Sequence, residues 1–352
     1  MSKLSRIDVS VIVVNYNCYS TLTECLRSIL LSRGVEELLL VDNASTDGSV
    51  EMVEKFTDVR LKTIRLKRNI GLAKARNLAA AEARGRYLAF TDADSRVDRE
   101  WLQEPCILLE KHKEIGAVQC KILSYRNPDK ISYAGLGFDG CDWKDMASDR
   151  LNSCRRILFP IGAGFIIRRE IWDLVKGFDP AFFVGNDDVD LGIRLWLSGY
   201  EVICSPRAIA YHDGGNLRSR KDVAPIFQFY SIRNLLSIWA KDLQASTLVK
   251  EVLPFLLPYL LMAFCQGGIP GGMAMISFLK KFPSILVKRN ETQLLRKTSD
   301  EKIMPMLLYI LPKQEITRGL DTFFKYIFRR FRDLARNIGN FIKIFSLTSK
   351  YG

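Results

Sequence analysis

The chain has 352 residues, which is enough for one large α/β domain with an added segment, or for two domains. Its hydrophobic content of 48% is ordinary for a globular protein with a sizeable core. The net charge is +13, and residues 280–352, with 16 Lys/Arg and 6 Asp/Glu, carry +10 of it. This basic tail would attract an anionic surface such as a membrane, a nucleic acid or an acidic polymer.

The cysteines argue against a structural zinc site. All eight are scattered, with no Cys-x-x-Cys pair and no histidine nearby at zinc-ligand spacing. Scattered cysteines in a chain of this length indicate reduced thiols and a cytosolic protein. The apolar run at residues 9–14 is too short for the core of a signal peptide and is better interpreted as a first strand.

Residues 1–95 alternate between apolar runs and helical patterns. The run at 9–17 is rich in β-branched residues, as in a buried parallel strand, and further strands are expected at 38–41, around 59–66 and just before Asp92. Helices are expected from Ser20, over 49–56, and after Asn69, where alanines precede Gly85 as a C-terminal cap. This order predicts an α/β fold, a mainly parallel sheet with helices on both faces.

Polar residues end several of these predicted strands. Asn15, Asp42, Asn69 and Asp92 all lie at strand ends or just beyond them, and Asn17 follows in the first loop. Ligands of such sheets bind at the carboxyl ends of the strands. These residues therefore predict a binding site, although polar residues commonly follow strands in any case.

Asp92 and Asp94 are separated by one residue at the end of an apolar strand. Two carboxylates this close repel each other unless a divalent cation lies between them. Mg²⁺ or Mn²⁺ prefers such hard oxygen ligands, together with the phosphates of a substrate. The alternative for an isolated Asp-x-Asp triplet is a solvated acidic turn.

The middle of the chain adds a second acidic group. A helix is expected around 98–113, a strand at 115–121, an irregular stretch at 122–160 and another strand at 200–204. Small residues at 162–164, ending in Gly164, permit a close backbone approach to a ligand or a strand.

Asp187, Asp188 and Asp190 crowd the first turn of a predicted helix. The helix dipole favours negative charge there, but three carboxylates are more than a cap needs. His212 is one of two histidines, and a lone histidine is more often structural than a ligand.

The C-terminal quarter contains two membrane-like features. Residues 252–279 include no charged residue, and this stretch is long enough to cross a bilayer. Prolines and pairs of glycines interrupt it. A re-entrant or interfacial helical hairpin is the preferred interpretation, with a helical pair packed on the enzyme or on a second subunit as the alternative. Residues 321–345 alternate large apolar and basic residues, which predicts an amphipathic helix on an anionic membrane surface.

The motifs taken together resemble those of the inverting glycosyltransferases of family 2, which have the GT-A fold, and especially the rhamnosyltransferase-like branch that extends lipid-linked glycans. The resemblance covers roughly residues 9–215. The matching stretches are 11–17, 41–48, 69–77, 90–94, 162–164, 177–179, 187–191 and 212–215. Each stretch is weak alone, but their order and spacing make a strong signal.

The resemblance implies a role for each matching residue. Asp42 would accept a hydrogen bond from the donor's base, and Asp92 and Asp94 would hold the ribose and a divalent metal (Mn²⁺ or Mg²⁺), which His212 completes. Asp188 matches the catalytic base. The remaining nucleotide-sugar contacts would come from Asn15, Asn17, Asn69, Gly71, Asn77 and Gly164.

Two departures from the branch leave one assignment open. The branch usually has Glu-Asp where this chain has Asp187 and Asp188, so Asp187 remains an alternative base. The branch also often has Asn-Pro-Asp or Asp-Asp-Asp where this chain has Asp-Ala-Asp at 92–94, but the carboxylates are kept.

The sequence therefore predicts a catalytic domain at residues 1–220 and a helical, basic, membrane-associating region at 221–352. The expected reaction moves a sugar from a nucleoside diphosphate donor to a hydroxyl of a polyprenyl-linked or other glycan, at the cytoplasmic face of the cell membrane. The alternatives are a polyprenyl-phosphate sugar synthase and an inactive sugar-nucleotide-binding or membrane scaffold. A nucleic-acid partner is not expected, and self-association is left open.

Overall fold

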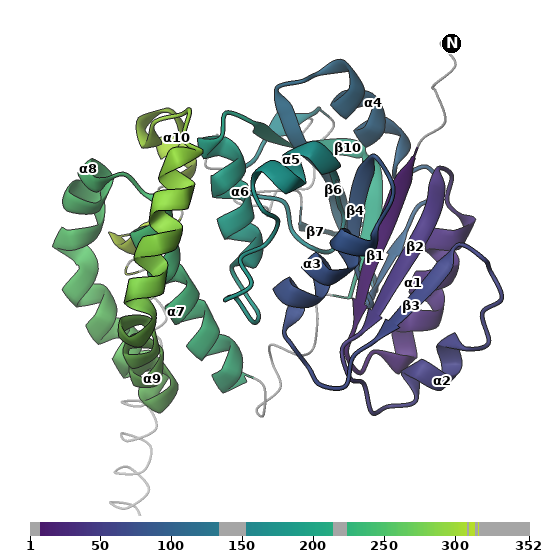
Figure 1. Cartoon of the computed structure of the whole chain (residues 1–352), viewed down its shortest axis with the longest axis horizontal. Helices are drawn as coiled ribbons and strands as arrows, with labels where there is room; N and C mark the ends of the chain where they lie inside the picture. The colour runs from purple at the N-terminus through teal and green to yellow at the C-terminus, as the bar shows by residue number, and fades with distance from the viewer. Residues whose placement is uncertain (1–7, 134–152, 214–223, 308–309, 314–315, 317–352) are drawn as a thin grey trace, which may run out of the picture.

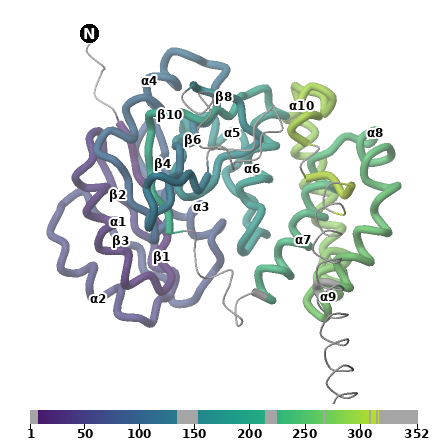
Figure 2. Tube along the Cα trace, turned by 180° about the vertical axis from the view of Figure 1, so that it is seen from behind, coloured from purple at the N-terminus to yellow at the C-terminus, as the bar shows by residue number. Residues whose placement is uncertain are grey.

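The computed structural model describes residues 8–133, 153–213, 224–307, 310–313 and 316. Figure 1 shows a twisted sheet flanked by helices, with the C-terminal helices gathered beyond α6 (Asp187–Leu197), far from α1 (Tyr19–Leu31) and α2 (Ser49–Val53). The same arrangement is seen from behind in Figure 2. The N-terminal half, with its alternating strand and helix patterns, thus forms a layered α/β unit, as the sequence predicts.

The first four long strands are parallel and lie in the order β3-β2-β1-β4. Asn15 is in register with Asp42, and Val14 with Asp92, so the polar strand ends meet at one edge of the sheet. The bounds of these strands and of the helix before β4 are β1 (Val9–Asn15), β2 (Val35–Asp42), β3 (Leu61–Arg65), α3 (Leu72–Glu82) and β4 (Tyr87–Asp92).

The second half of the sheet is mixed in direction. β9 lies antiparallel between β4 and β6, β10 runs parallel to β6, and β5 closes the order antiparallel to β10. The bounds are β5 (Ser95–Val97), α4 (Gln103–Lys111), β6 (Ile115–Ser124), β7 (Ile131–Tyr133), β8 (Arg155–Arg156), β9 (Phe165–Arg168), α5 (Arg169–Leu174) and β10 (Glu201–His212). The stretch at 122–160 that was expected to be irregular therefore contributes strand residues at both ends, and residues 134–152 lie outside the described part.

Two hydrophobic clusters cover the two faces of the sheet. Successive strand residues point to opposite faces, so Val11 and Val13 belong to one cluster and Ile12 to the other. The first cluster packs beneath α1 and α4, and the second beneath α3, α5 and α6. The second cluster continues into the C-terminal helices through Trp239.

The prediction that Gly85 caps the alanine-rich helix is wrong. α3 ends at Glu82, and Ala83 is extended, with φ −67° and ψ 150°. Gly85 instead lies against β1, where a Cβ atom would be 2.6 Å from the backbone nitrogen of Ser10. The glycine is needed for this close approach, and not for a left-handed cap.

The C-terminal helices are α7 (Ala224–Asp242), α8 (Ala245–Thr247), the π-helical turn η2 (Leu248–Val252), α9 (Leu253–Leu294) and α10 (Asp300–Leu307). α9 consists of two helices joined at a kink, where Gly268 has φ 51° and ψ −134°. The expectation that glycines interrupt the apolar stretch therefore agrees with the structure. One side of α9 packs on α7, with Tyr259 4.8 Å from Trp239 between ring centroids.

The other side of α9 is apolar and exposed. Leu253, Leu257, Leu261 and Phe264 recur at helical spacing and are 56–66% exposed. Within the described residues, the segment Ala245–Cys265 is long and apolar enough to cross a membrane by length and composition, and 17% of its most apolar window is buried. The predicted amphipathic helix at 321–345 lies outside the described residues.

Candidate active site

Asp92, Asp94 and His212 form one group at the carboxyl edge of the sheet. Asp92 ends β4, and His212 ends β10, where the pairing with β5 sets it opposite Ser95. His212 Nε2 lies 3.2 Å from Asp94 Oδ1 and 3.8 Å from Asp92 Oδ2. One potential ligand atom from each of the three residues lies within 4.8 Å of the others. The structure thus brings the three predicted metal ligands together.

The chemistry of this group fits a divalent cation. Burial would raise the pKa of Asp94, but the hydrogen bond and charge of His212 outweigh it and lower that pKa. The carboxylate is therefore held ionised, as a metal ligand must be. Two carboxylate oxygens with one imidazole nitrogen suit Mn²⁺ or Mg²⁺, which keep further positions for water or phosphate.

Arg76 is a site residue that the sequence analysis did not single out. It extends from α3, with Nη2 2.6 Å from Asp92 Oδ1 and Nη1 3.2 Å from Asp187 Oδ2. Its guanidinium is buried over the ring of Phe178, at 5.3 Å from the centroid. A Cβ atom on Gly162 would lie 1.8 Å from Arg76 Nη2, so the glycine makes room for the guanidinium.

A signal for Arg76 was present in the sequence. The arginine stands within the alanine-rich helix, three residues after Ala73 and three before Ala79, both of which are fully buried. Residues three apart share a helix face, so Arg76 had to be on the buried side. A buried guanidinium requires acidic partners, and two of the predicted site residues supply them.

The three aspartates at the start of α6 have different surroundings. Asp187 is buried, and burial raises its pKa while the charge of Arg76 opposes the rise. Asp188 is half-buried, beside it in the same helical turn. Asp190 is fully buried and pairs with Arg194, at 2.5 Å, and with Lys241. Asp190 therefore belongs to an ion network inside the protein, and Asp188 is the more accessible of the two predicted bases.

The predicted base-binding residues form a hydrogen-bonded cluster where β1 and β2 end. Asn15 Nδ2 donates to Asp42 Oδ1 and to Ser45 Oγ, each at 2.9 Å. Asn17, at a positive φ of 57°, accepts a hydrogen bond from the backbone nitrogen of Thr46. These bonds tie the two loops together and hold the Asp42 carboxylate at the sheet edge.

Asn69 and Gly71 shape the next loop. Asn69 Oδ1 accepts hydrogen bonds from Asn43 Nδ2, at 3.0 Å, and from the backbone nitrogen of Gly71, at 2.9 Å. Gly71 has φ 87°, and a Cβ atom there would lie 2.8 Å from the carbonyl oxygen of Phe183. The loop before α3 therefore rests on the loop before α6, which joins the two halves of the site.

Asn77 and Gly164 are engaged inside the protein. Asn77 Nδ2 donates to the carbonyl oxygen of Phe178 at 2.7 Å, and Asn77 Oδ1 accepts from the backbone nitrogen of the same residue at 3.0 Å. Gly164 directly precedes β9, and a Cβ atom there would come within 3.2 Å of the side chains of Ile122 on β6 and Ala210 on β10. Both residues thus have partners within the protein, and their contact with a nucleotide stays a prediction.

Comparison with known proteins adds independent findings. The family described as "Glycosyl transferase family 2" matches residues 10–175. The O-antigen biosynthesis protein RfbC of Myxococcus xanthus is 30% identical over 198 residues, which are 52% of this chain and 15% of RfbC. The putative teichuronic acid biosynthesis glycosyltransferase TuaG of Bacillus subtilis is 35% identical over 99 residues, 27% of this chain and 39% of TuaG. The chain thus spans less than half the length of the curated relatives it matches first.

Solved structures share the fold. The mannosyltransferase PcManGT from Pyrobaculum calidifontis, in complex with GDP-Man and Mn²⁺, aligns with a TM-score of 0.50 at 21% identity, over 82% of this chain and 88% of its own. GalNAc-T7 with UDP, GalNAc and Mn²⁺ aligns with a TM-score of 0.52 at 20% identity, over 66% of this chain and 47% of its own. At these identities the likeness concerns the fold alone.

Proposed function

We propose that this chain, which has the GT-A fold and matches glycosyltransferase family 2 over residues 10–175, is an inverting glycosyltransferase acting on a lipid-linked glycan. The reaction moves a sugar from a nucleoside diphosphate donor to an acceptor hydroxyl by a single displacement. The observation that carries the proposal is the Asp92–Asp94–His212 group, which Arg76 joins to the acidic turn at Asp187.

The donor half of the site lies at the ends of β1, β2 and β4. Asp42, oriented by Asn15, accepts a hydrogen bond from the base of the donor nucleotide. Asp92, Asp94 and His212 hold a divalent cation, which supplies positive charge to the leaving diphosphate. Fold neighbours solved with GDP-Man and Mn²⁺ or with UDP and Mn²⁺ support a metal-dependent nucleotide donor.

Asp188 is the general base in this proposal. An inverting transfer needs a carboxylate that takes the proton of the acceptor hydroxyl as the oxygen attacks the anomeric carbon. Asp187 is buried and bound by Arg76, whereas Asp188 is more accessible in the same turn. Arg76 and Asp187 then fix the position of α6 relative to the residues that would hold the metal.

The exposed apolar face of α9 supports a membrane-bound acceptor. An apolar side chain at Leu257 or Leu261 is stable in lipid and costly in water. The basic sequence at 280–352 adds attraction to anionic lipids. We place the enzyme at the cytoplasmic face of the cell membrane, with α9 lying in the interface. The protein should pellet with anionic vesicles in the absence of detergent, and a failure to pellet would contradict this placement.

The proposed reaction is tested by release of nucleoside diphosphate in detergent. A panel of sugar nucleotides is supplied with Mn²⁺ or Mg²⁺ and with native membrane lipids as acceptor. We expect metal-dependent release from one donor class, reduced about 10²–10⁴-fold in Asp188→Asn because the general base is lost. Asp173→Asn, an exposed change on α5, is the matched control.

Each outcome of this assay has a separate meaning. Unchanged release in Asp188→Asn would move the base to Asp187 or refute the assignment. Transfer to bare polyprenyl phosphate would indicate a polyprenyl-phosphate sugar synthase instead. If no donor is consumed, calorimetry with the same nucleotides and Mn²⁺ separates an enzyme without its acceptor from a protein that binds no donor.

A further inference from the structure

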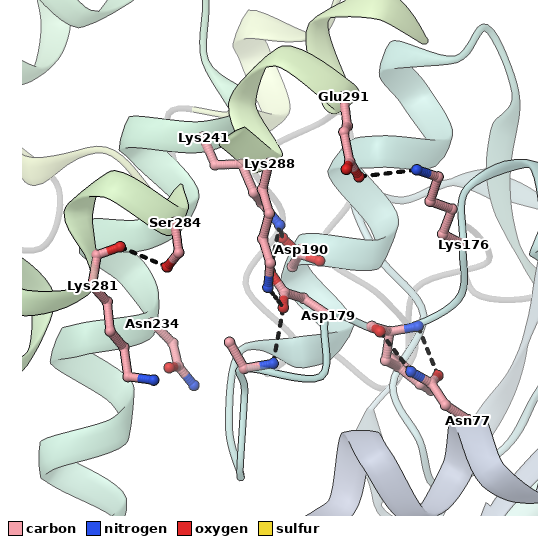
Figure 3. A network of polar contacts seen from close by, with 12 residues as sticks. Asn77, Lys176, Asp179, Asp190, Asn234, Lys241, Lys281, Ser284, Lys288 and Glu291 are labelled. Carbon is pink, nitrogen blue, oxygen red and sulfur yellow. Dashed lines mark hydrogen bonds and ion pairs between the residues drawn. The ribbon is translucent and has the colours of Figure 1, made fainter. Parts of the chain in front are cut away.

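A basic cavity lies between α7, the second half of α9 and the loop that follows α5. Its polar lining includes Asp179 on the loop, Arg233 and Lys241 on α7, and Lys281 and Lys288 on α9. Figure 3 shows Lys241 and Lys288 directed toward Asp179 and Asp190, with Lys281 extending alongside from α9. This cavity is distinct from the metal group and has no role in the reaction described above.

The charges that line the cavity do not balance. Asp179 is its one lining carboxylate among the described residues, and Lys241 and Lys288 both bind it. Lys241 has Asp190 as a further partner away from the cavity. Arg233 and Lys281 make no ion pair with any described residue. Four cations therefore share one carboxylate in this lining, and two of them form no ion pair.

Arg233 is the more informative of the two because it is buried. Its Nη2 donates to the carbonyl oxygen of Ala181 at 2.6 Å, and Nε and Nη2 donate to Asn234 Oδ1, while Nη1 has no protein acceptor among the described residues. Burial lowers the pKa of Arg233, and the charges of Tyr230 and Asp179 oppose this only in part. Buried charges in proteins are usually paired, so the position is suited to an anion supplied from outside.

The cavity is also at the right level for a membrane phosphate. The charge-free run of α9 ends at Leu279, and Lys281 and Lys288 lie about 3 Å and about 14 Å further along the helix axis. The polar zone of a bilayer extends about 5–8 Å beyond the hydrocarbon on each side. With the charge-free run of α9 in lipid, Lys281 reaches phosphate groups and not acyl chains, whereas Lys288 lies beyond the polar zone.

The loop that lines the cavity leads directly to the proposed base. Arg233 holds Ala181, Asn234 Nδ2 donates to the carbonyl oxygen of Gly185 at 2.6 Å, and Asn186 Nδ2 donates to the carbonyl oxygen of Ser231 at 3.0 Å. α6 begins at the next residue, Asp187. An anion bound by Arg233 would therefore lie against the same loop that positions Asp188.

We propose that this cavity binds the phosphate or diphosphate that joins the glycan acceptor to its lipid. The identity of the acceptor rests on the proposed function, whereas the binding of a lipid-borne phosphate rests on the cavity itself. Guanidinium and ammonium groups are the usual ligands of phosphate oxygens. Binding at this place sets the acceptor's lipid along α9 and its glycan toward Asp188.

The test uses farnesyl diphosphate as a probe of the lipid-borne diphosphate. Binding to the full chain is measured by calorimetry in a maltoside detergent, with EDTA present so that the metal group cannot bind the probe. We expect binding that inorganic pyrophosphate displaces and that farnesol does not. Lys281→Met should weaken it about tenfold or more, because one charge-assisted contact is lost. Lys280→Met, at the neighbouring exposed position outside the cavity, is the matched control.

The outcomes that overturn the proposal are separate from those that overturn the proposed function. An equal loss of affinity for the probe in both lysine variants would mean that the basic surface attracts the diphosphate non-specifically. Displacement of the probe by phosphatidylglycerol at equal concentration would make the cavity a site for bulk membrane lipid and not for the acceptor. Binding of UDP or GDP with Mn²⁺ is measured on the same preparation, and its absence would refute the donor chemistry while leaving the cavity result intact.

Discussion

Replacement of Arg76 by methionine tests the connection between the metal group and the acidic turn. The guanidinium contacts Asp92 and Asp187, and the side chains of Arg76 and Asp187 are 4% and 5% exposed. Methionine fills a similar volume but removes the positive charge. Asp187 would then be a buried carboxylate without its cation, and we expect the folded protein to lose stability.

The magnitude follows from the burial of the pair. Removal of one partner from a buried ion pair costs about 3–5 kcal/mol, because the other charge stays desolvated. For a chain of this length that loss lowers the melting temperature by about 4–7 °C. The loss should also depend on pH. Without Arg76, the already raised pKa of Asp187 rises further, so the folded state binds a proton more readily than the unfolded state. The penalty is absent below about pH 4 and grows as the pH is raised.

Thermal melting of Arg76→Met between pH 5 and pH 8 measures this effect without any substrate. The double variant Arg76→Met/Asp187→Asn should recover part of the loss and should show less pH dependence, because no buried carboxylate is left unpaired. The reasoning would be refuted if Arg76→Met melted like the unchanged protein, or if adding Asp187→Asn caused a further full loss.

Other features give predictions of their own. His212→Ala should lower the affinity for Mn²⁺ at least about tenfold in calorimetry, because one ligand of three is lost, and unchanged affinity would place the metal elsewhere. Gly71→Ala should lower the free energy of unfolding by more than about 1–2 kcal/mol in denaturant, because φ is positive at this position and the backbone of Phe183 leaves no room for a Cβ atom. A variant of unchanged stability would contradict this loop geometry. Leu257→Glu should reduce pelleting with anionic vesicles, whereas Val59→Glu, at a position of the α/β unit that is 93% exposed, should not. An equal loss of pelleting in both variants would argue against insertion of α9. Asp179→Asn should flatten the fall in melting temperature below about pH 4. The lysine partners outweigh burial and lower the pKa of this carboxyl, so its stabilisation is present above its unfolded pKa and lost on acidification, and an unchanged acid limb would contradict this.

The local pattern of the sequence was sufficient for much of the fold. Near-continuous apolar runs in β1 and β2 predict both strands, and the parallel register in the structure brings Asn15 beside Asp42. The α/β fold class is confirmed, and residues 10–175 match the glycosyltransferase family 2 model, in line with the predicted resemblance. The antiparallel insertion of β9 between β4 and β6 could not be predicted, because pairing of strands distant in sequence leaves no local pattern.

The sequence predicts those site residues whose side chains have one characteristic chemistry. Asp92, Asp94 and His212 carry metal-binding groups, and the structure assembles them. Arg76 was missed because its partner Asp187 is 111 residues away and only the fold brings them together. The nucleotide contact of Asn77 is implied only by the family resemblance and stays a prediction, whereas its hydrogen bonds to Phe178 depend on a loop whose position the sequence does not encode locally.

The place of β10 in the sheet also determines when the metal site can form during synthesis. β5 starts directly after Asp94 and pairs with β10, which ends at His212, and β6 has β10 along one side. A nascent chain that has emerged only to residue 175, where the family match ends, contains both carboxylates but no strand to fix the loop after them. Its β5 and β6 would expose unpaired edges, which are templates for association with other chains. N-terminal fragments of this chain should therefore aggregate before they bind metal, and β10 must leave the ribosome before the proposed metal site can form.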